Sequence, residues 1–383
     1  MNILVVSNYY PNNNDTQFCI FIQQQAEALS QLGHNVEVIV PYAVGSLKEQ
    51  IHQETMSGVP VYYAQYFTLY KKIYSRFALM RNIKVLEQFF DFSKYDVISI
   101  HMFDEFTLRI FSRIADIHHI KLVVHYHGLS ILYDQPISFL IQLLQRRGNR
   151  VLRKLVEKAD AVVGVSEKVC ERVSETLSIK SVFTVYNGVN TKLFQPSDTK
   201  YEDFTIISVA SLKKIKGNHY LIDAVKRIKE TYANQNIRLK LIGRGPEKEA
   251  LLSQIREYHM EHIVELIGYI NYEEVAKILP QCNVFAMPSY YEALGCAYLE
   301  AMACKLPVIG CKNQGIDEIV KDGINGFLID PHDVNQLFEK LEYLLMHKNA
   351  GYEIGLNGYY TVIKNFTWQD SAKSLVKVYQ QLL

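Results

Sequence analysis

Residues 284–310 combine two kinds of hydrophobic pattern, and this combination is the strongest constraint on the fold. An apolar run at 284–287 has strand length and ends at Pro288, which cannot continue a hydrogen-bonded ladder. A helical stretch at about 294–304 follows, and a second apolar run occupies 307–310. A strand, a helix and a strand in this order form a parallel crossover, with the first loop at the carboxyl end of its strand. The stretch therefore predicts an α/β fold.

The loop and the helix start of this unit carry groups that suit a nucleotide-sugar. Glu292 and Glu300 are eight residues apart, so on one helix they would point about 80° apart. Glu292 is therefore expected in the loop and Glu300 inside the helix. Carboxylates accept hydrogen bonds from sugar hydroxyls, and bare N–H groups at a helix start suit a phosphate. The residues expected to offer those N–H groups are Ala293, Leu294, Gly295 and Cys296. For isolated glutamates, the alternative is two ordinary solvated side chains.

Length and composition narrow the class of protein. A chain of 383 residues is long for one core, so two domains are expected. The net charge of +1 argues against a dedicated nucleic-acid binder. Six cysteines without metal-type spacing are typical of a reducing compartment. We find no signal-peptide pattern and no run of 18 apolar residues, so a cytoplasmic location without a membrane span is expected.

The rest of the chain repeats the alternation of strands and helices in two halves. The first half has a helical pattern at 18–32 and strand patterns at 3–7, 36–40, 97–101, 122–127, 161–166 and 182–185. The second half has strand patterns at 205–210, 239–243 and 264–268 before the unit described above. The polar stretch at 191–203 contains Pro196 and no strong periodicity, which indicates a linker.

The run Pro-Ser-x-x-Glu-x-x-Gly-x-x-x-x-Glu-Ala-Met-Ala at 288–303 resembles the sugar-donor site of the family 4 retaining glycosyltransferases. Leu-Pro-Val-Ile at 306–309 and Glu-Ile-Val-x-Asp-Gly-x-Asn-Gly at 318–326 continue the resemblance. It implies the GT-B architecture, in which two Rossmann-like β/α/β domains face each other across a cleft. The implied limits are an acceptor-side domain at 1–192, a linker at 193–203, a nucleotide-sugar domain at 204–365 and a helix at 366–383 that returns to the first domain.

The resemblance also assigns roles to single residues. Lys216 matches a lysine that binds the diphosphate, whereas Ser211 stands where the family commonly has arginine. Lys213 or Lys214 could supply the missing charge. Glu292 would hold the sugar and Glu300 the ribose hydroxyls. The turns at the ends of two strands would border the nucleobase, and they contain Gly243, Arg244 and Ile270.

Two histidines stand at the ends of strand patterns in the first half. His127, followed by Gly128, matches a family position that contacts the sugar from the other domain. His101 is expected on the acceptor side with less support. For both, the alternative is a histidine whose hydrogen bonds are satisfied locally.

Two basic stretches suit an anionic membrane surface, because some of their basic residues lie next to apolar ones. A solvated helix face is the alternative of similar weight. The residues concerned are Lys71, Lys72, Arg76, Arg146, Arg147 and Arg150. Members of the resembled family often glycosylate lipid-linked acceptors, so a peripheral position on the inner face of the cell membrane is expected.

The sequence thus predicts a retaining glycosyltransferase, of the hexosyltransferase type, that acts on a lipid-linked or cell-surface glycan intermediate. No Asp-x-Asp motif is present, so no metal and no other cofactor are expected. Lys216 and the helix start near Gly295 would instead oppose the charge of the departing diphosphate. Two alternatives remain open: an epimerase or phosphorylase of the same fold, and a non-catalytic partner subunit, which Ser211 and Cys19 at phosphate-facing positions would suit.

Overall fold

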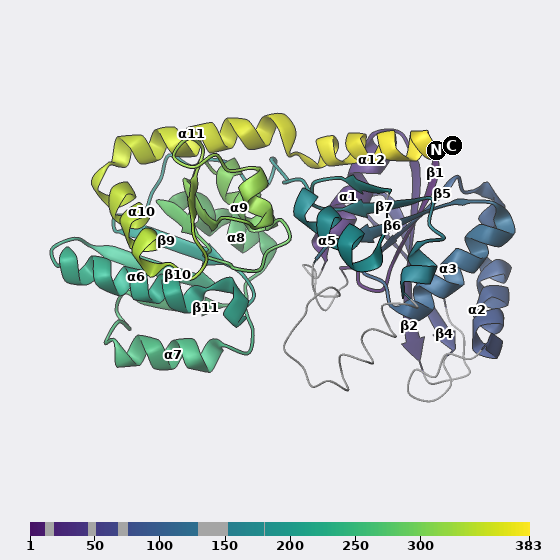
Figure 1. Cartoon of the computed structure of the whole chain (residues 1–383), viewed down its shortest axis with the longest axis horizontal. Helices are drawn as coiled ribbons and strands as arrows, with labels where there is room; N and C mark the ends of the chain where they lie inside the picture. Colours follow the sequence, from purple (N-terminus) through teal and green to yellow (C-terminus); the bar gives the residue numbers. More distant parts are fainter. Residues whose placement is uncertain (12–18, 45–50, 68–75, 129–151, 180) are drawn as a thin grey trace. The chain divides into compact units, whose positions relative to one another are not determined.

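The structure is a computed structural model that describes residues 1–11, 19–44, 51–67, 76–128, 152–179 and 181–383 (Figure 1). These residues form two compact units, each built around one sheet. The first unit comprises Met1–Tyr186 and Trp368–Leu383, and the second comprises Asn187–Thr367. The α/β class predicted from the sequence is confirmed. The domain limits predicted at 192, 203 and 365 stay a prediction.

The sheet of the first unit has the strand order β3-β4-β2-β1-β5-β6-β7-β8. Its pairs are parallel except for the antiparallel hairpin of β3 and β4. The strands are β1 (Asn2–Ser7), β2 (Asn35–Val44), β3 (Ile51–Met56), β4 (Val59–Phe67), β5 (Val97–His101), β6 (Lys121–Tyr126), β7 (Ala161–Gly164) and β8 (Val182–Thr184). The α-helices among the described residues of this unit are α1 (Ile20–Gln31), α2 (Arg76–Phe89), α3 (Glu105–His118), α5 (Glu167–Leu177) and α12 (Trp368–Leu382).

Alternate residues of these strands fill two layers of core, since both faces of the parallel sheet are covered. On one face, Val5 and Val38 belong to the same apolar cluster as Ile22 of α1 and Leu375 of α12. Helices α1 and α12 lie side by side over this face, although they come from opposite ends of the sequence (Figure 1). The last helix is therefore part of the core of the first unit.

The sheet of the second unit is parallel throughout, in the order β11-β10-β9-β12-β13-β14. Its strands are β9 (Phe204–Val209), β10 (Ile237–Ile242), β11 (Val264–Gly268), β12 (Val284–Ala286), β13 (Val308–Cys311) and β14 (Phe327–Ile329). Its helices are α6 (Asn218–Thr231), α7 (Lys248–Glu257), α8 (Tyr272–Ile278), α9 (Cys296–Ala303), α10 (Val334–Met346) and α11 (Lys348–Asn365). The strand order reverses direction between β9 and β12, and such a switch point is where open α/β sheets bind ligands.

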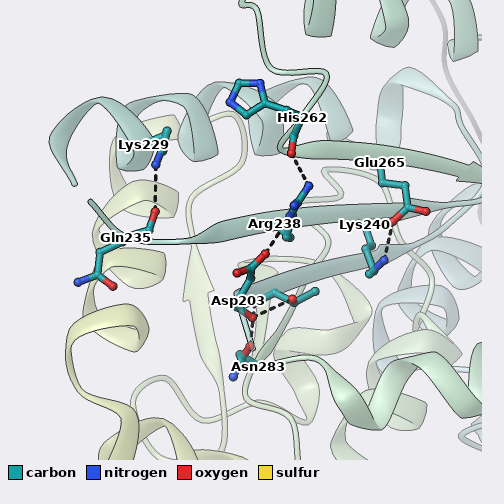
Figure 2. Close-up of polar contacts among 9 residues, drawn as sticks. Asp203, Lys229, Gln235, Arg238, Lys240, His262, Glu265 and Asn283 are labelled. Atoms are coloured by element: carbon teal, nitrogen blue, oxygen red, sulfur yellow. Dashed lines mark hydrogen bonds and ion pairs between the residues drawn. The ribbon is translucent and has the colours of Figure 1, made fainter. Parts of the chain in front are cut away.

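Polar contacts close the opposite, amino-terminal edge of this sheet (Figure 2). Arg238 pairs with Asp203 at 2.9 Å, and Lys240 pairs with Glu265 at 2.5 Å. A hollow of about 470 Å³ lies beside these pairs. Its lining has four acidic side chains against two basic ones, which disfavours a diphosphate. Because ligands also bind at the carboxyl ends of parallel strands, this hollow is not a candidate for the nucleotide-sugar.

Several elements differ from the sequence prediction. The β3–β4 hairpin and β14 had no predicted counterpart, nor had helices α2, α3, α5, α7, α8 and α11. Most predicted strand limits shift by one or two residues. Helix α9 begins at Cys296 rather than near residue 294, because Gly295 adopts a left-handed conformation just before it. Among the described residues, none of the helices has the length and apolar character needed to cross a lipid bilayer.

Candidate active site

Two loops of the second unit flank the switch point of its sheet. The first follows β9, contains the short helical turn Lys214–Lys216 and leads through Gly217 into α6. The second follows β12 and runs from residue 287 to Gly295 at the start of α9. Strands β9 and β12 are hydrogen-bonded neighbours, so their loops emerge next to each other. The residues that the sequence assigned to a nucleotide-sugar thus gather at the edge where the topology predicts a ligand.

Backbone contacts fix the two loops against each other. The N–H of Tyr290 and the hydroxyl of Ser289 both donate to the carbonyl of Ile215, each at 3.1 Å. Gly217 has φ +71°, and a Cβ there would meet the carbonyl oxygen of Pro288 at 2.2 Å. Position 217 therefore requires glycine for two reasons, its left-handed backbone and the close approach of the neighbouring loop. The loop that carries Lys216 cannot move without disturbing the loop that carries Glu292.

Lys216 and Glu292 form an ion pair between these loops. Their side chains are only 17% and 11% exposed, so the pair is largely shielded from water. The backbone of Glu292 is held in turn, because its N–H donates to Gln314 Oε1 at 3.0 Å and its carbonyl accepts from the N–H of Gly315. As the sequence predicted, Glu292 lies in the loop rather than on the helix. The pair places one cationic and one anionic group at the switch point.

Glu300 lies inside α9 and is 8% exposed. Burial raises the pKa of its carboxyl group to about 7, although the hydrogen bond from the Tyr272 hydroxyl, at 2.8 Å, works in the opposite direction. A carboxyl group with a pKa in this range changes its charge readily when a ligand donates a hydrogen bond to it. Glu300 is therefore suited to accept hydrogen bonds from ribose hydroxyls.

The residues between Glu292 and Glu300 differ in burial and in the contacts that they make. Leu294 is buried and packs in the core, whereas Ala293 and Gly295 are half-buried before the first turn of α9. The Cys296 thiol accepts a hydrogen bond from the Asn187 amide at 3.4 Å. Burial raises the pKa of Cys296 to about 12, so this cysteine stays a neutral thiol and offers no nucleophile. The start of α9 brings the positive end of its helix dipole to the site.

The neighbouring strands β10 and β11 bring the remaining predicted residues to the same edge. The N–H of Leu212 donates to the carbonyl of Arg244 at 2.9 Å, which places Arg244 beside the loop of Ser211. The Arg244 guanidinium lies over the ring of Tyr269, 4.3 Å from its centroid. A Cβ on Gly243 would meet the carbonyl oxygen of Ala210 at 1.8 Å, so these two turns pack directly together.

The side chains at this edge differ in how exposed they are. Ser211, Lys213 and Lys214 are exposed, and Ile270 is half-buried. Arg244 thus joins the two lysines as a candidate for the charge that is missing at Ser211. The predicted roles of these residues stay predictions.

His127 and His101 lie together in the first unit. His101 Nδ1 and His127 Nε2 are 2.8 Å apart, and the second ring nitrogen of His101 contacts Ser99 at 2.9 Å. His101 is 1% exposed, so any role on the acceptor side would act through His127. His127 Nδ1 is buried and has no hydrogen-bond partner. It is the one ring nitrogen of His127 that these contacts leave without a partner.

The predicted membrane-facing residues cannot be placed as a group. Arg76 begins α2. The other five, Lys71, Lys72, Arg146, Arg147 and Arg150, lie outside the described residues.

Both halves of the chain match families of glycosyltransferases. The family described as Glycosyltransferase Family 4 matches residues 20–193, and the family described as Glycosyl transferases group 1 matches residues 189–359. The chain is a family 4 glycosyltransferase. The family predicted from the motif at 288–303 is thereby confirmed.

Individual relatives agree with this assignment. An uncharacterized glycosyltransferase of Methanocaldococcus jannaschii is 30% identical to the enzyme over 62% of this chain and 64% of that protein. One human subunit of phosphatidylinositol N-acetylglucosaminyltransferase is 26% identical over 100% of this chain and 76% of its own length. The solved structure of the Anabaena protein HepE in complex with UDP superposes with a TM-score of 0.78 at 18% identity and covers 100% of both chains. The likeness to solved structures shows that the enzyme has the GT-B fold.

Sequence reasoning missed several residues that support the predicted ones. Tyr272 and Gln314 hold Glu300 and Glu292, yet each comes from a separate loop or helix. Gln314 had a signal, because Gln-Gly-Ile-Asp-Glu at 314–318 resembles a Gly-Gly-x-x-Glu pattern of the family with glutamine in place of the first glycine. Ser99 and His125 also had a signal: each lies two residues before a predicted histidine and so on the same face of its strand.

Proposed function

We propose that the enzyme transfers a sugar from a UDP-sugar to a hydroxyl group of a lipid-linked or cell-surface glycan, with retention of the anomeric configuration. The observation that carries the proposal is the shielded Lys216–Glu292 pair at the switch point, next to the buried Glu300. UDP is favoured because the Anabaena structure contains UDP, and further structures of the same protein are described with UDP-glucose. A glycolipid acceptor is suggested by the name of the human relative.

Each group has a role in this reaction. The acceptor oxygen forms a bond to the anomeric carbon as the bond from that carbon to the diphosphate oxygen breaks, and the acceptor proton passes to the leaving phosphate. Lys216 and the amino-terminal end of α9 oppose the negative charge that develops on the diphosphate. Glu292 binds the sugar, Glu300 binds the ribose, and His127 donates or accepts one hydrogen bond to a sugar hydroxyl. These groups meet the charge without a metal ion, so we propose that the transfer requires none.

A thermal-shift screen of UDP-, GDP- and ADP-sugars tests the proposal. UDP-sugars are expected to raise the melting temperature with and without EDTA, because a ligand at 100 times its Kd stabilises the folded state by about 2.7 kcal/mol. The shift is expected to shrink by half or more in Glu300→Ala and to persist in full in Lys248→Ala, which removes an exposed lysine of α7. A folded protein that responds to no nucleotide-sugar would favour a non-catalytic partner subunit. A response to UDP-sugar followed by turnover without any acceptor to a second sugar nucleotide would favour an epimerase.

We also propose that the enzyme is cytoplasmic and binds the membrane surface through α2. Phe77 and Met80 on this helix are 67% and 39% exposed, and Lys84 continues the same face with helical spacing. Apolar and basic groups on one helix face bind anionic lipid headgroups. The double variant Phe77→Ser and Met80→Ser is expected to lose most of its co-sedimentation with vesicles that contain phosphatidylglycerol. Ile117→Ser, which changes an exposed residue of α3, is the matched control. Equal sedimentation with neutral and anionic vesicles would contradict the proposal.

A further inference from the structure

A row of buried polar side chains crosses the apolar core of the first unit. Ser99 and His101 of β5 and His125 of β6 are at most 3% exposed, and they lie on the sheet face that α1 and α12 cover. Tyr379 of α12 is fully buried, and its hydroxyl donates to Ser99 Oγ at 2.8 Å. The row begins at this tyrosine and ends at His127, at the carboxyl edge of the sheet. Polar groups in a core are costly unless their hydrogen bonds are satisfied, so the partners of each atom matter.

Ser99 is the branch point of the row. Its Oγ lies 2.9 Å from His101 Nε2 and 2.9 Å from His125 Nε2, in addition to the contact from Tyr379. A hydroxyl has one hydrogen and two lone pairs. Because one lone pair accepts from Tyr379, Ser99 must donate to one histidine and accept from the other. One of the two Nε2 atoms therefore carries a proton and the other does not.

This constraint passes from His101 to His127. If Ser99 donates to His101 Nε2, the His101 proton sits on Nδ1 and is donated to His127 Nε2, so His127 carries its own proton on Nδ1. If His101 instead donates to Ser99, its Nδ1 accepts from His127 Nε2 and leaves His127 Nδ1 as an acceptor. Both arrangements are neutral and satisfy the same contacts. His127 Nδ1, which has no partner, is a donor in one arrangement and an acceptor in the other.

We propose that Ser99, His101 and His125 form a tautomer relay that sets the hydrogen-bonding role of His127 Nδ1 toward a hydroxyl group of the transferred sugar. The assignment of the ligand rests on the proposed function, whereas the relay itself rests on the contacts among the four residues. Ser99, His101 and His125 are positioning residues, because each acts through another side chain. The ring of Phe21, 4.6 Å from that of His127, helps to hold the last member in place.

The surroundings keep the relay neutral. Burial lowers the pKa of His127 to about 3, and burial followed by the neighbouring histidines lowers the pKa of His101 well below its ordinary value. Burial, followed by His127, also lowers the pKa of His125. A neutral imidazole keeps one donor and one acceptor nitrogen, which a relay of this kind needs. The arrangement is therefore suited to orient a hydroxyl group rather than to hold a positive charge.

A bound metal ion is the competing explanation for three clustered histidines. His101, His125 and His127 are the one such group within the described part of the chain, with ligand atoms within 4.8 Å of one another. Their rings are nearly parallel, at 16° for His101 and His125 and 24° for His101 and His127. Ring nitrogens direct their lone pairs within the ring plane, so stacked rings do not converge on one ion as a tetrahedral site requires. The 2.8 Å contact between His101 and His127 also has the length of a hydrogen bond.

Nitrogen NMR of the full-length enzyme with ¹⁵N-labelled histidine tests the relay. In the wild type, UDP-glucose or UDP-N-acetylglucosamine is expected to shift the ring signals of His127 and His101 together, whereas UDP alone leaves both unchanged. In Ser99→Ala the coupling to His125 is lost, and affinity for the responding UDP-sugar is expected to fall about fivefold, with UDP affinity unchanged. Ser99→Thr, which keeps the hydroxyl, is expected to restore the coupling. If Ser99→Ala does not fold, His101→Phe takes its place in this test, because it keeps a stacked ring but removes the ring nitrogens of the relay.

Ser112→Ala is the matched control, because it removes a buried hydroxyl of α3 in the same unit that has no hydrogen-bond partner. The relay would be overturned if Ser99→Ala and Ser112→Ala behaved alike, or if His127 responded to the sugar while His101 did not. One equivalent of tightly bound metal that disappears in His125→Ala would overturn it in favour of a metal site. Failure of every UDP-sugar to bind the wild type would count against the proposed function, whereas the ring signals of the unliganded protein would still report the paired tautomers.

Discussion

Lys216→Ala is expected to lower turnover about 10²- to 10³-fold, the usual effect of removing one group that opposes charge in a transition state. Lys216 is the cation that the structure holds at the switch point, through its ion pair with Glu292 and the two loops fixed around it. Turnover is measured as release of UDP from the responding UDP-sugar, with water as the acceptor when no other is available. Lys248→Ala controls for the loss of an exposed lysine elsewhere in the unit.

Variants of Glu292, the ion-pair partner of Lys216, test the same prediction in a second way. In Glu292→Gln, Lys216 loses its anionic neighbour, so UDP is expected to bind at least as tightly as to the wild type while turnover falls. In Lys216→Ala, the shielded carboxylate of Glu292 faces the diphosphate unpaired, so UDP binding weakens. Removing both charges is expected to restore part of the UDP affinity. If folded Lys216→Ala keeps more than about a third of the turnover, the charge at the diphosphate must come from Lys213, Lys214 or Arg244 instead.

Glu300→Ala is expected to weaken binding of the responding UDP-sugar about 10- to 100-fold, because hydrogen bonds to a charged group contribute about 1.5–3 kcal/mol. The affinity of the wild type should also depend on pH. Burial raises the pKa of Glu300 to about 7, so the carboxylate that accepts the ribose hydroxyls is fully formed only above this pH. Affinity is expected to increase as the pH rises through about 7 and then to level off. Isothermal titration calorimetry in buffers of different ionisation enthalpy measures the proton released on binding.

Two variants separate the carboxylate from its surroundings. Glu300→Gln has no ionisable group at this position, so its affinity should lack the rise near pH 7. Tyr272→Phe removes the hydrogen bond that lowers the pKa of Glu300 but keeps the carboxyl group, so the rise in affinity should move to higher pH while binding above it stays almost normal. A wild-type affinity that is flat between pH 6 and pH 8, about one unit either side of the pKa, would show that Glu300 does not ionise on binding.

The sequence was sufficient for features that depend on local spacing. The eight-residue interval between Glu292 and Glu300 predicted one residue in the loop and one in the helix, and the structure has this arrangement. The strand patterns at 97–101 and 264–268 agree with β5 and β11 residue for residue. Strand β5 is buried along its whole length, so its apolar run stands out. The β3 strand was missed because it lies at an edge of the sheet and alternates weakly, with Ile51 and Met56 as its only large apolar residues.

Features that depend on distant parts of the chain could not be predicted in this way. Lys216 and Glu292 are 76 residues apart, and nothing in their local sequence shows that they pair. Tyr379 and Ser99 are 280 residues apart. The pattern of alternate polar residues in β5 and β6 was visible, but only the strand order places the two strands side by side. The predicted roles of individual residues still depend on the experiments above.

The packing of α12 has a consequence for the order in which the enzyme is made. A domain usually folds as a unit while synthesis proceeds from the amino terminus. Here the core of the first unit includes Trp368, Leu375 and Tyr379, which are synthesised after the whole of the second unit. The nascent chain therefore completes the second sheet before the first can be covered on both faces. During that interval the apolar face that receives α12 is open, and Ser99 lacks the hydroxyl that anchors the buried histidines.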